Sequence, residues 1–195
     1  EKNCFKAGLT TVTDAGLDLS TILLIDSLQR TGDLTIRVYA MANPNEENFA
    51  YFEKNGEIST NRLQVSSIKI YADGALGSRG AKLKQPYCDH GNNTGIWVTH
   101  PNQIDALCQR IDAMGFQANT HCIGDSANRQ VLDIYGKYLK NTNDQRWRIE
   151  HAQVVTPADR ELFAQYSILP SVQPTHATSD MNWVDERLCK DRMQG

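Results

Sequence analysis

The sequence lacks several features that would place it in a specialised class of protein. No apolar run approaches the roughly 18 residues that suggest a membrane-spanning helix, and the N-terminal stretch Glu1–Cys4 lacks the apolar core of a signal peptide. Positive charge is not in excess, because 20 Lys and Arg stand against 23 Asp and Glu, for a net charge of -3. This mild acidity excludes a nucleic-acid binder that works through a basic surface. We therefore expect neither a nucleic-acid partner nor a membrane partner.

Cysteine is scarce and irregularly spaced. The five cysteines show no CxxC spacing: Cys4, Cys88, Cys108, Cys122 and Cys189. A disulfide scaffold usually has an even number of cysteines in a shorter secreted chain, and a Cys-ligated structural zinc needs closely spaced pairs. The sequence therefore predicts reduced thiols and a cytoplasmic protein.

Glycine-rich nucleotide-binding motifs are also missing, since neither GxGxxG after the first expected strand nor GxxxxGK[ST] occurs. What the 195 residues do contain is a regular alternation of β-rich apolar runs and amphipathic runs. Strands are expected at Leu9–Thr13, Leu34–Ala40, Val65–Ala72, Phe116–Thr120, Arg146–His151 and Ile168–Val172. Helices are expected around Ile22–Leu28, Glu46–Lys54, Gln103–Met114, Ser126–Leu139 and Pro157–Tyr166. This order predicts an α/β fold with a parallel sheet. A (β/α) TIM barrel is favoured, although a full one has eight strands and about 250 residues, so the barrel should be incomplete or the sheet open.

Polar side chains gather at the carboxyl ends of the expected strands, where barrel active sites are built. His121 and His151 end consecutive strands, and Lys69 lies on the strand before them. One strand-end histidine is usually a hydrogen-bonded structural residue, but two on adjacent strands favour a metal site. A buried Lys69 would pair with Asp73 or Glu150, or else serve as a metal ligand or a Schiff-base nucleophile. We expect Lys69, His121 and His151 to lie at one mouth of a curved sheet.

Four motifs carry a resemblance that extends over essentially the whole chain, from Gly8–Gly16 onward. They are KIYADGALGSRGA at 69–81, GFQANTHCIGDSAN at 115–128, RIEHAQ at 148–153 and SVQPTHATSDM at 171–181. Together they resemble the amidohydrolase superfamily, and within it the amidohydrolase-3 branch of YtcJ-like metal-dependent hydrolases, which is related to N-substituted formamide deformylase.

The resemblance implies a (β/α) barrel with a small β-sandwich built from both chain ends. Lys69 matches the family's strand lysine, which is carboxylated in many members and bridges two metals, while His121 and His151 match two metal-ligating histidines. The implied cofactor is one or two divalent ions, with zinc expected. Arg79 and His176 are candidates for substrate contact, and Asp125 is expected to cap or position a helix.

The departures from the family pattern limit what this chain can do. It has no His-X-His pair, and the family's general-base aspartate would follow a later strand, so the catalytic residue is expected outside the chain. Residues 1–195 are therefore expected to form a partial barrel domain, about strands two to seven, without the β-sandwich or the first and eighth strands. Such a segment should bind metal weakly or not at all, and should be inactive alone.

The hypothesis is a metal-dependent hydrolase that cleaves C–N bonds of a small non-peptide amide or formamide-like substrate by attack of a metal-bound hydroxide. The alternative is a catalytically silent barrel segment or binding scaffold. An aldolase using Lys69 is disfavoured, because it gives the two histidines no joint purpose. Finally, the cut edges Leu9–Thr13 and Ile168–Val172 would expose unpaired backbone groups, so we expect a homo-oligomeric contact or a distorted barrel there.

Overall fold

The chain divides into two compact units. The computed structural model describes residues 1–193. The first unit comprises Glu1–Ile70 together with Arg110–Ala118, and the second comprises Tyr71–Gln109 together with the chain from Asn119 onward.

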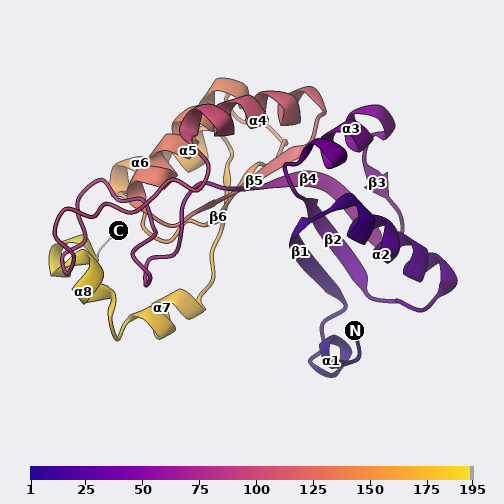
Figure 1. Ribbon diagram of the computed structural model, residues 1–195, viewed down its shortest axis with the longest axis horizontal. Helices are drawn as coiled ribbons and strands as arrows, with labels where there is room; N and C mark the ends of the chain where they lie inside the picture. The colour runs from indigo at the N-terminus through magenta and orange to yellow at the C-terminus, as the bar shows by residue number, and fades with distance from the viewer. Residues whose placement is uncertain (194–195) are drawn as a thin grey trace. The chain divides into compact units, whose positions relative to one another are not determined.

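The first unit is built on a parallel sheet. Strand β1 (Thr11–Leu17) pairs in parallel with β2 (Arg37–Ala42), which pairs in parallel with β4 (Leu63–Tyr71). A two-residue strand, β3 (Ile58–Ser59), adds to β4 in the antiparallel sense. Figure 1 shows this sheet in indigo and purple, accompanied by α1 (Lys2–Lys6), α2 (Leu19–Thr31) and α3 (Glu46–Asn55).

Local sequence explains where these helices begin and end. Helix α3 begins after Asn45, whose side-chain oxygen accepts from the backbone N–H of Asn48 at 2.9 Å, so that one free helix-end donor is satisfied. Helix α2 ends at Gly32, which has a φ of 84° in the left-handed region that favours glycine. The helices bury Ile22, Phe49 and Phe52 as part of the apolar core. The unit is therefore held mainly by apolar packing.

The second unit carries three further parallel strands. Strand β5 (Gln117–Cys122) pairs with β6 (Arg148–His151), and β6 pairs with β7 (Leu169–Ser171). Its helices are α5 (Asp125–Tyr138), α6 (Pro157–Gln165), α7 (Thr175–Asp180), α8 (Val184–Leu188) and the 3₁₀ helix η1 (Lys190–Arg192). Helix α4 (Pro101–Ala113) begins in this unit, and its last residues, from Arg110, belong to the first. In Figure 1, α5 and α6 run above β5 and β6, whereas α7 and α8 lie below them.

The predicted order of six parallel strands and intervening helices is confirmed. Five of the described elements were not expected: α1, β3, α7, α8 and η1. Each is short, and none shows the apolar periodicity that reveals longer elements. Among the described residues, no helix is both long enough and apolar enough to cross a membrane.

The expectation of uniformly reduced thiols is wrong. Cys88, in the long loop after β4, forms a disulfide with Cys189, which directly follows α8, and their Cα atoms are 5.8 Å apart. Cys4, Cys108 and Cys122 are free. The two bonded cysteines are 101 positions apart, so no local spacing announces them. The cytoplasmic location loses the support it drew from the cysteines and stays a prediction.

Candidate functional site

The structure brings two of the predicted metal ligands together at the carboxyl ends of neighbouring strands. In the β5–β6 register, His121 lies opposite Glu150 and Cys122 lies opposite His151. The two imidazole rings have centroids 4.7 Å apart and are inclined at 75°. The His121 side chain is 15% exposed. Two imidazoles this close can bind the same ion or molecule. Their role as metal ligands stays a prediction.

His151 has a rarely adopted backbone conformation, and its side chain is hydrogen-bonded to Gln173. His151 has a φ of 75° and Ala152 a φ of 44°, a region that non-glycine residues seldom adopt. Such strain persists only where surrounding contacts enforce it, and it clusters at functional sites. Nδ1 of His151 lies 2.5 Å from Oε1 of Gln173, whose own Nε2 donates to the carbonyl of Ser171 at 3.0 Å. Because Gln173 presents its oxygen, this contact favours the Nδ1–H tautomer of a neutral imidazole, in which Nε2 is the atom suited to bind a metal.

A buried carboxylate supports the strand end that carries His121. Asp73, only 2% exposed, accepts backbone N–H groups from Ile123 at 2.9 Å and from Gly124 and Lys82 at 2.8 Å each. Its Oδ1 also lies 3.6 Å from Nε2 of His121. Burial raises the pKa of Asp73 from 3.8 to about 6, against the lowering effect of the three N–H donors. Asp73 thus ties the loop after β4 to the end of β5.

Close backbone packing surrounds this carboxylate. A Cβ placed on Gly124 would lie 2.0 Å from the carbonyl oxygen of Lys82, so only glycine fits there. The fully buried Asn128 donates through Nδ2 to the carbonyls of Gly124 at 2.9 Å and Val154 at 3.2 Å. Asn128 thereby joins the segment after β5 to the segment after β6. These contacts fix the two strand ends that bear the histidines.

Two further predicted site residues, Lys69 and Arg79, are each engaged by groups of the protein itself. Lys69, in the first unit, is 3% exposed and its Nζ donates to the carbonyl of Ile70 at 3.2 Å. Its convergence with the two histidines stays a prediction.

Arg79 has a φ of 59° and binds Asp89 through two hydrogen bonds of 3.0 and 2.8 Å, which raise the pKa of its guanidinium. A contact between Arg79 and a substrate likewise stays a prediction.

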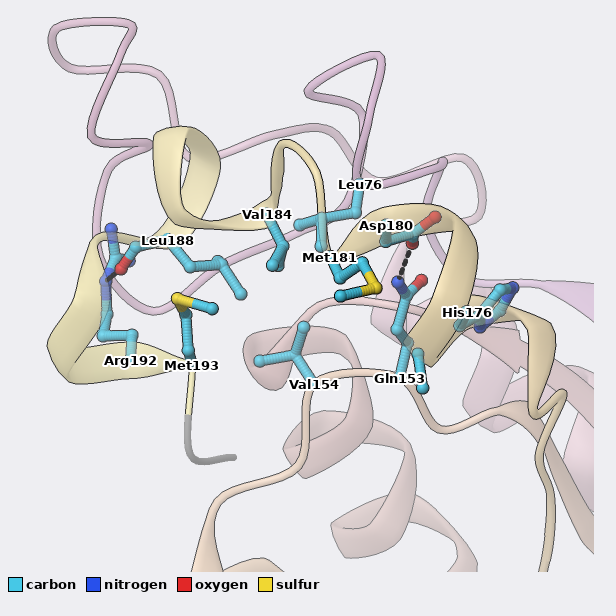
Figure 2. A pocket seen from close by; sticks show the side chains of 11 residues that line it. Leu76, Gln153, Val154, His176, Asp180, Met181, Val184, Leu188, Arg192 and Met193 are labelled. Atoms are coloured by element: carbon cyan, nitrogen blue, oxygen red, sulfur yellow. Dashed lines mark hydrogen bonds between the residues drawn. The ribbon is translucent and has the colours of Figure 1, made fainter.

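His176, at the start of α7, continues the row of histidines. Its ring centroid lies 5.7 Å from that of His151. His176 also lines a pocket of about 350 Å³, whose other walls include Leu76, Val154 and Met181. Figure 2 shows His176 at one end of this pocket. The candidate site is therefore continuous with a mainly apolar pocket.

The supporting roles of Asp73 and Gln173 were not predicted from the sequence. In the sequence, Asp73 shares a strand face with Lys69, and Gln173 follows the last expected strand. Their supporting roles could not be predicted, because Asp73 binds Ile123 and Gln173 binds His151, which lie in distant segments. Asp125 is the first residue of α5 and accepts from the N–H of Lys84 at 2.8 Å, so it holds the long loop beside the helix start. Its expected capping of the helix stays a prediction. Within the part of the chain that the structure describes, no three His, Cys, Asp or Glu side chains form a group that could hold a metal.

Comparisons with known proteins find sequence similarity over most of the chain. Residues 2–195 match the sequence model of the amidohydrolase family (Amidohydro_3). The chain is 35% identical over 141 residues to the protein LONG AFTER FAR-RED 3 of Arabidopsis thaliana, a match that covers 71% of this chain and 24% of the plant protein. It is also 35% identical over 143 residues to YtcJ of Bacillus subtilis (strain 168), which is named as an amidohydrolase, covering 73% of this chain and 27% of YtcJ.

A solved structure extends the match to the fold. The crystal structure of a metal-dependent hydrolase from Pyrococcus furiosus matches with a TM-score of 0.88 and 27% sequence identity. The match covers 98% of this chain but 40% of that one. The predicted fold class, an incomplete TIM barrel of the metal-dependent hydrolase type, is confirmed. The chain spans only about a quarter of the length of the two sequence relatives, namely 24% of the plant protein and 27% of YtcJ.

Proposed function

Because the chain belongs to the amidohydrolase family, we propose that it carries part of the active site of a metal-dependent hydrolase. The proposed substrate is a small non-peptide amide or formamide-like molecule, whose C–N bond is cleaved. The observation that carries the proposal is the histidine pair on β5 and β6, with rings 4.7 Å apart and with His151 oriented by Gln173. Similarity to the metal-dependent hydrolase from Pyrococcus furiosus supports it.

The two histidines fit a divalent cation as a partial set of ligands. Catalytic zinc usually has three protein ligands and one open position, so His121 and His151 supply two of three. We propose Lys69 as a further ligand after carboxylation, because an anionic carbamate removes the penalty for burying an ammonium group. When bound, the cation acts as a Lewis acid and brings the pKa of a bound water to about 7.

The protein's own groups would set the geometry of the reaction. Gln173 holds the Nδ1–H tautomer of His151, and Asp73 fixes the loop beside His121. Arg79 and His176 are proposed to contact the substrate. Proton transfer to the leaving amine needs an acidic group, and the expected aspartate for this step follows a later strand of the family barrel. The proposal therefore assigns metal binding and positioning to this chain.

Metal binding tests the proposal most directly. Zinc binding to the metal-depleted protein would be measured by competition with a chelating dye, for the wild type, His151→Gln and Gln173→Ala. We expect His151→Gln to abolish the site, and Gln173→Ala to weaken zinc binding by about 10- to 100-fold, because a ligand's supporting partner is lost. His90→Gln, which changes an exposed histidine in the long loop, is the matched control. Equal zinc affinity in His151→Gln and His90→Gln would contradict the proposal.

A second candidate function is a catalytically silent binding scaffold. It is favoured by one observation, that the described residues contain no complete group of three His, Cys, Asp or Glu metal ligands. Turnover of a simple amide separates the two functions. The measurement uses a longer form that also carries the family's remaining barrel strands, because this segment is expected to be inactive alone. In that form a hydrolase should release amine in the presence of zinc and stop when zinc is chelated, whereas a scaffold should bind ligands with no turnover in either condition.

A further inference from the structure

We propose that the pocket beside His176 is the subsite for an apolar substituent of the substrate, namely an uncharged alkyl or aryl group attached to the scissile amide. This inference rests on the function proposed above. It is carried by a pocket of about 350 Å³ that adjoins the histidine row. Ligand pockets typically span about 300 to 1,000 Å³ and have mainly apolar walls with a few placed polar groups.

The walls of the pocket select an apolar ligand. Leu76, Val154 and Leu188 belong to the buried apolar cluster of the second unit and form its floor. Met181 is 65% exposed and Met193 is 42% exposed, so both lie on the open side. Unbranched thioether side chains adapt to ligands of different shape. An apolar group placed here would cover methionine surface that now faces water.

His176, Gln153 and Asp180 gather at one end of the pocket, which sets the direction proposed for the ligand. Figure 2 shows His176 and the Gln153–Asp180 pair at one end of the pocket, with Leu188 and Met193 toward the other. Nε2 of Gln153 donates to Oδ2 of Asp180 at 2.5 Å. Since the His176 ring lies 5.7 Å from that of His151, the polar end adjoins the candidate metal ligands. The amide would lie at this end, and its substituent would extend among the apolar side chains.

A charged side chain lies at the far end of the pocket, and its N–H donors bind the pocket wall. Arg192 is located there, but its guanidinium donates to the carbonyls of Pro86 at 2.7 Å and Gln85 at 3.3 Å, and its Nε donates to that of Leu188 at 2.8 Å. These bonds join η1 to the long loop, beside the Cys88–Cys189 disulfide. Arg192 therefore supports the wall with these donors, and the preference for an apolar substituent rests on Leu76, Val154 and Leu188.

The test measures binding without turnover. Isothermal titration calorimetry would compare acetamide, N-butylacetamide and N-hexylacetamide on the metal-free protein. Affinity should rise by about fourfold for each added methylene that is buried. Met181→Glu should weaken binding of N-hexylacetamide by about tenfold or more, because it places a charge on the apolar wall. Met181→Leu should retain binding. Ile96→Glu, at a position that is 57% exposed in the long loop and outside this pocket, is the matched control.

The outcomes are separable from those for the hydrolase. Chain-length dependence that is lost in Met181→Glu and kept in Ile96→Glu supports the subsite, even if no amide is hydrolysed. Equal affinity for the three amides, no binding of N-hexylacetamide, or equal loss in both glutamate variants would overturn the subsite. Zinc-dependent hydrolysis that is insensitive to Met181→Glu would overturn it while leaving the hydrolase intact.

Discussion

Both units of the molecule have an apolar core, and they differ in the polar and covalent contacts added to it. In the first, buried aromatic and aliphatic side chains such as Phe49, Phe52 and Ile68 dominate the interior. In the second, the strand ends are held by the buried polar residues Asp73 and Asn128, each with several hydrogen-bond partners, and by a disulfide. Apolar packing tolerates small shifts, whereas satisfied polar networks specify one arrangement. In the unit that carries His121 and His151, directional bonds and a disulfide add to the apolar core at the strand ends.

Removing the disulfide should give the largest effect on the second unit. The double variant Cys88→Ser/Cys189→Ser should lose about 4 to 5 kcal/mol of unfolding free energy, since the bond closes a loop of about 100 residues in the unfolded chain. Urea unfolding of the variant and the oxidised wild type would measure the difference. Cys4→Ser, at a free cysteine, should change stability little. A loss below about 1 kcal/mol would show that the bond contributes little.

Removing the Asp73 carboxylate should come next in size. Asp73→Ala leaves the N–H groups of Ile123, Gly124 and Lys82 buried without their acceptor, at a cost of about 3 kcal/mol. Hydrogen exchange should show faster exchange at these amides, with β1 and β2 unchanged. Asn45→Ala in the first unit, which removes a single helix cap, should cost about 1 kcal/mol. Loss of protection spread equally over both units would contradict the contrast between them.

Acid should weaken the second unit through Asp159. Burial raises the pKa of this carboxyl, but hydrogen bonds from Lys84, Thr156 and Arg129 outweigh burial and lower the pKa below 3.8. A lowered folded-state pKa means that the stabilisation is complete above the unfolded-state pKa of about 4 and is lost as pH falls through the folded-state value.

The matching measurement is urea unfolding of wild type and Asp159→Asn as a function of pH. We expect the smallest of the three effects here, a flatter dependence below about pH 4 in the variant. Asp144→Asn is the control, because Asp144 is 82% exposed in its pair with Arg146. Parallel pH curves for wild type and Asp159→Asn would rule out this contribution.

Much of the fold could be predicted because it depends on local periodicity. Helix α3 was expected at Glu46–Lys54 and runs from Glu46 to Asn55, and α4, α5 and α6 are similarly close. Helix α2, expected around Ile22–Leu28, is longer and runs from Leu19 to Thr31. Strand β1 was expected at Leu9–Thr13 but runs from Thr11 to Leu17. Its end contains Asp14 and Gly16, and its register shifts between Ala15 and Leu17, so pairing with β2 overrides the weak β-propensity of these residues.

The candidate site was only partly predictable. The histidines could be identified because their strands end in motifs that resemble a known family. The residues that hold them in place could not, because the partners of Asp73 come from about 50 positions later and Gln173 reaches back 22 positions to His151. The Cys88–Cys189 bond spans an even greater separation. Contacts between distant positions leave no periodic signal in a single sequence.

The disulfide gives the second unit the topology of a ring with two tails. Residues 88 to 189 form a closed covalent loop that contains both candidate histidines and the three strands of the second unit. A single proteolytic cut inside this ring does not separate the pieces, which part only when the bond is also reduced. Closing the ring also brings residues that are 101 positions apart within a short covalent path. Once the bond has formed, the parallel pairing of β5, β6 and β7 therefore requires a smaller conformational search.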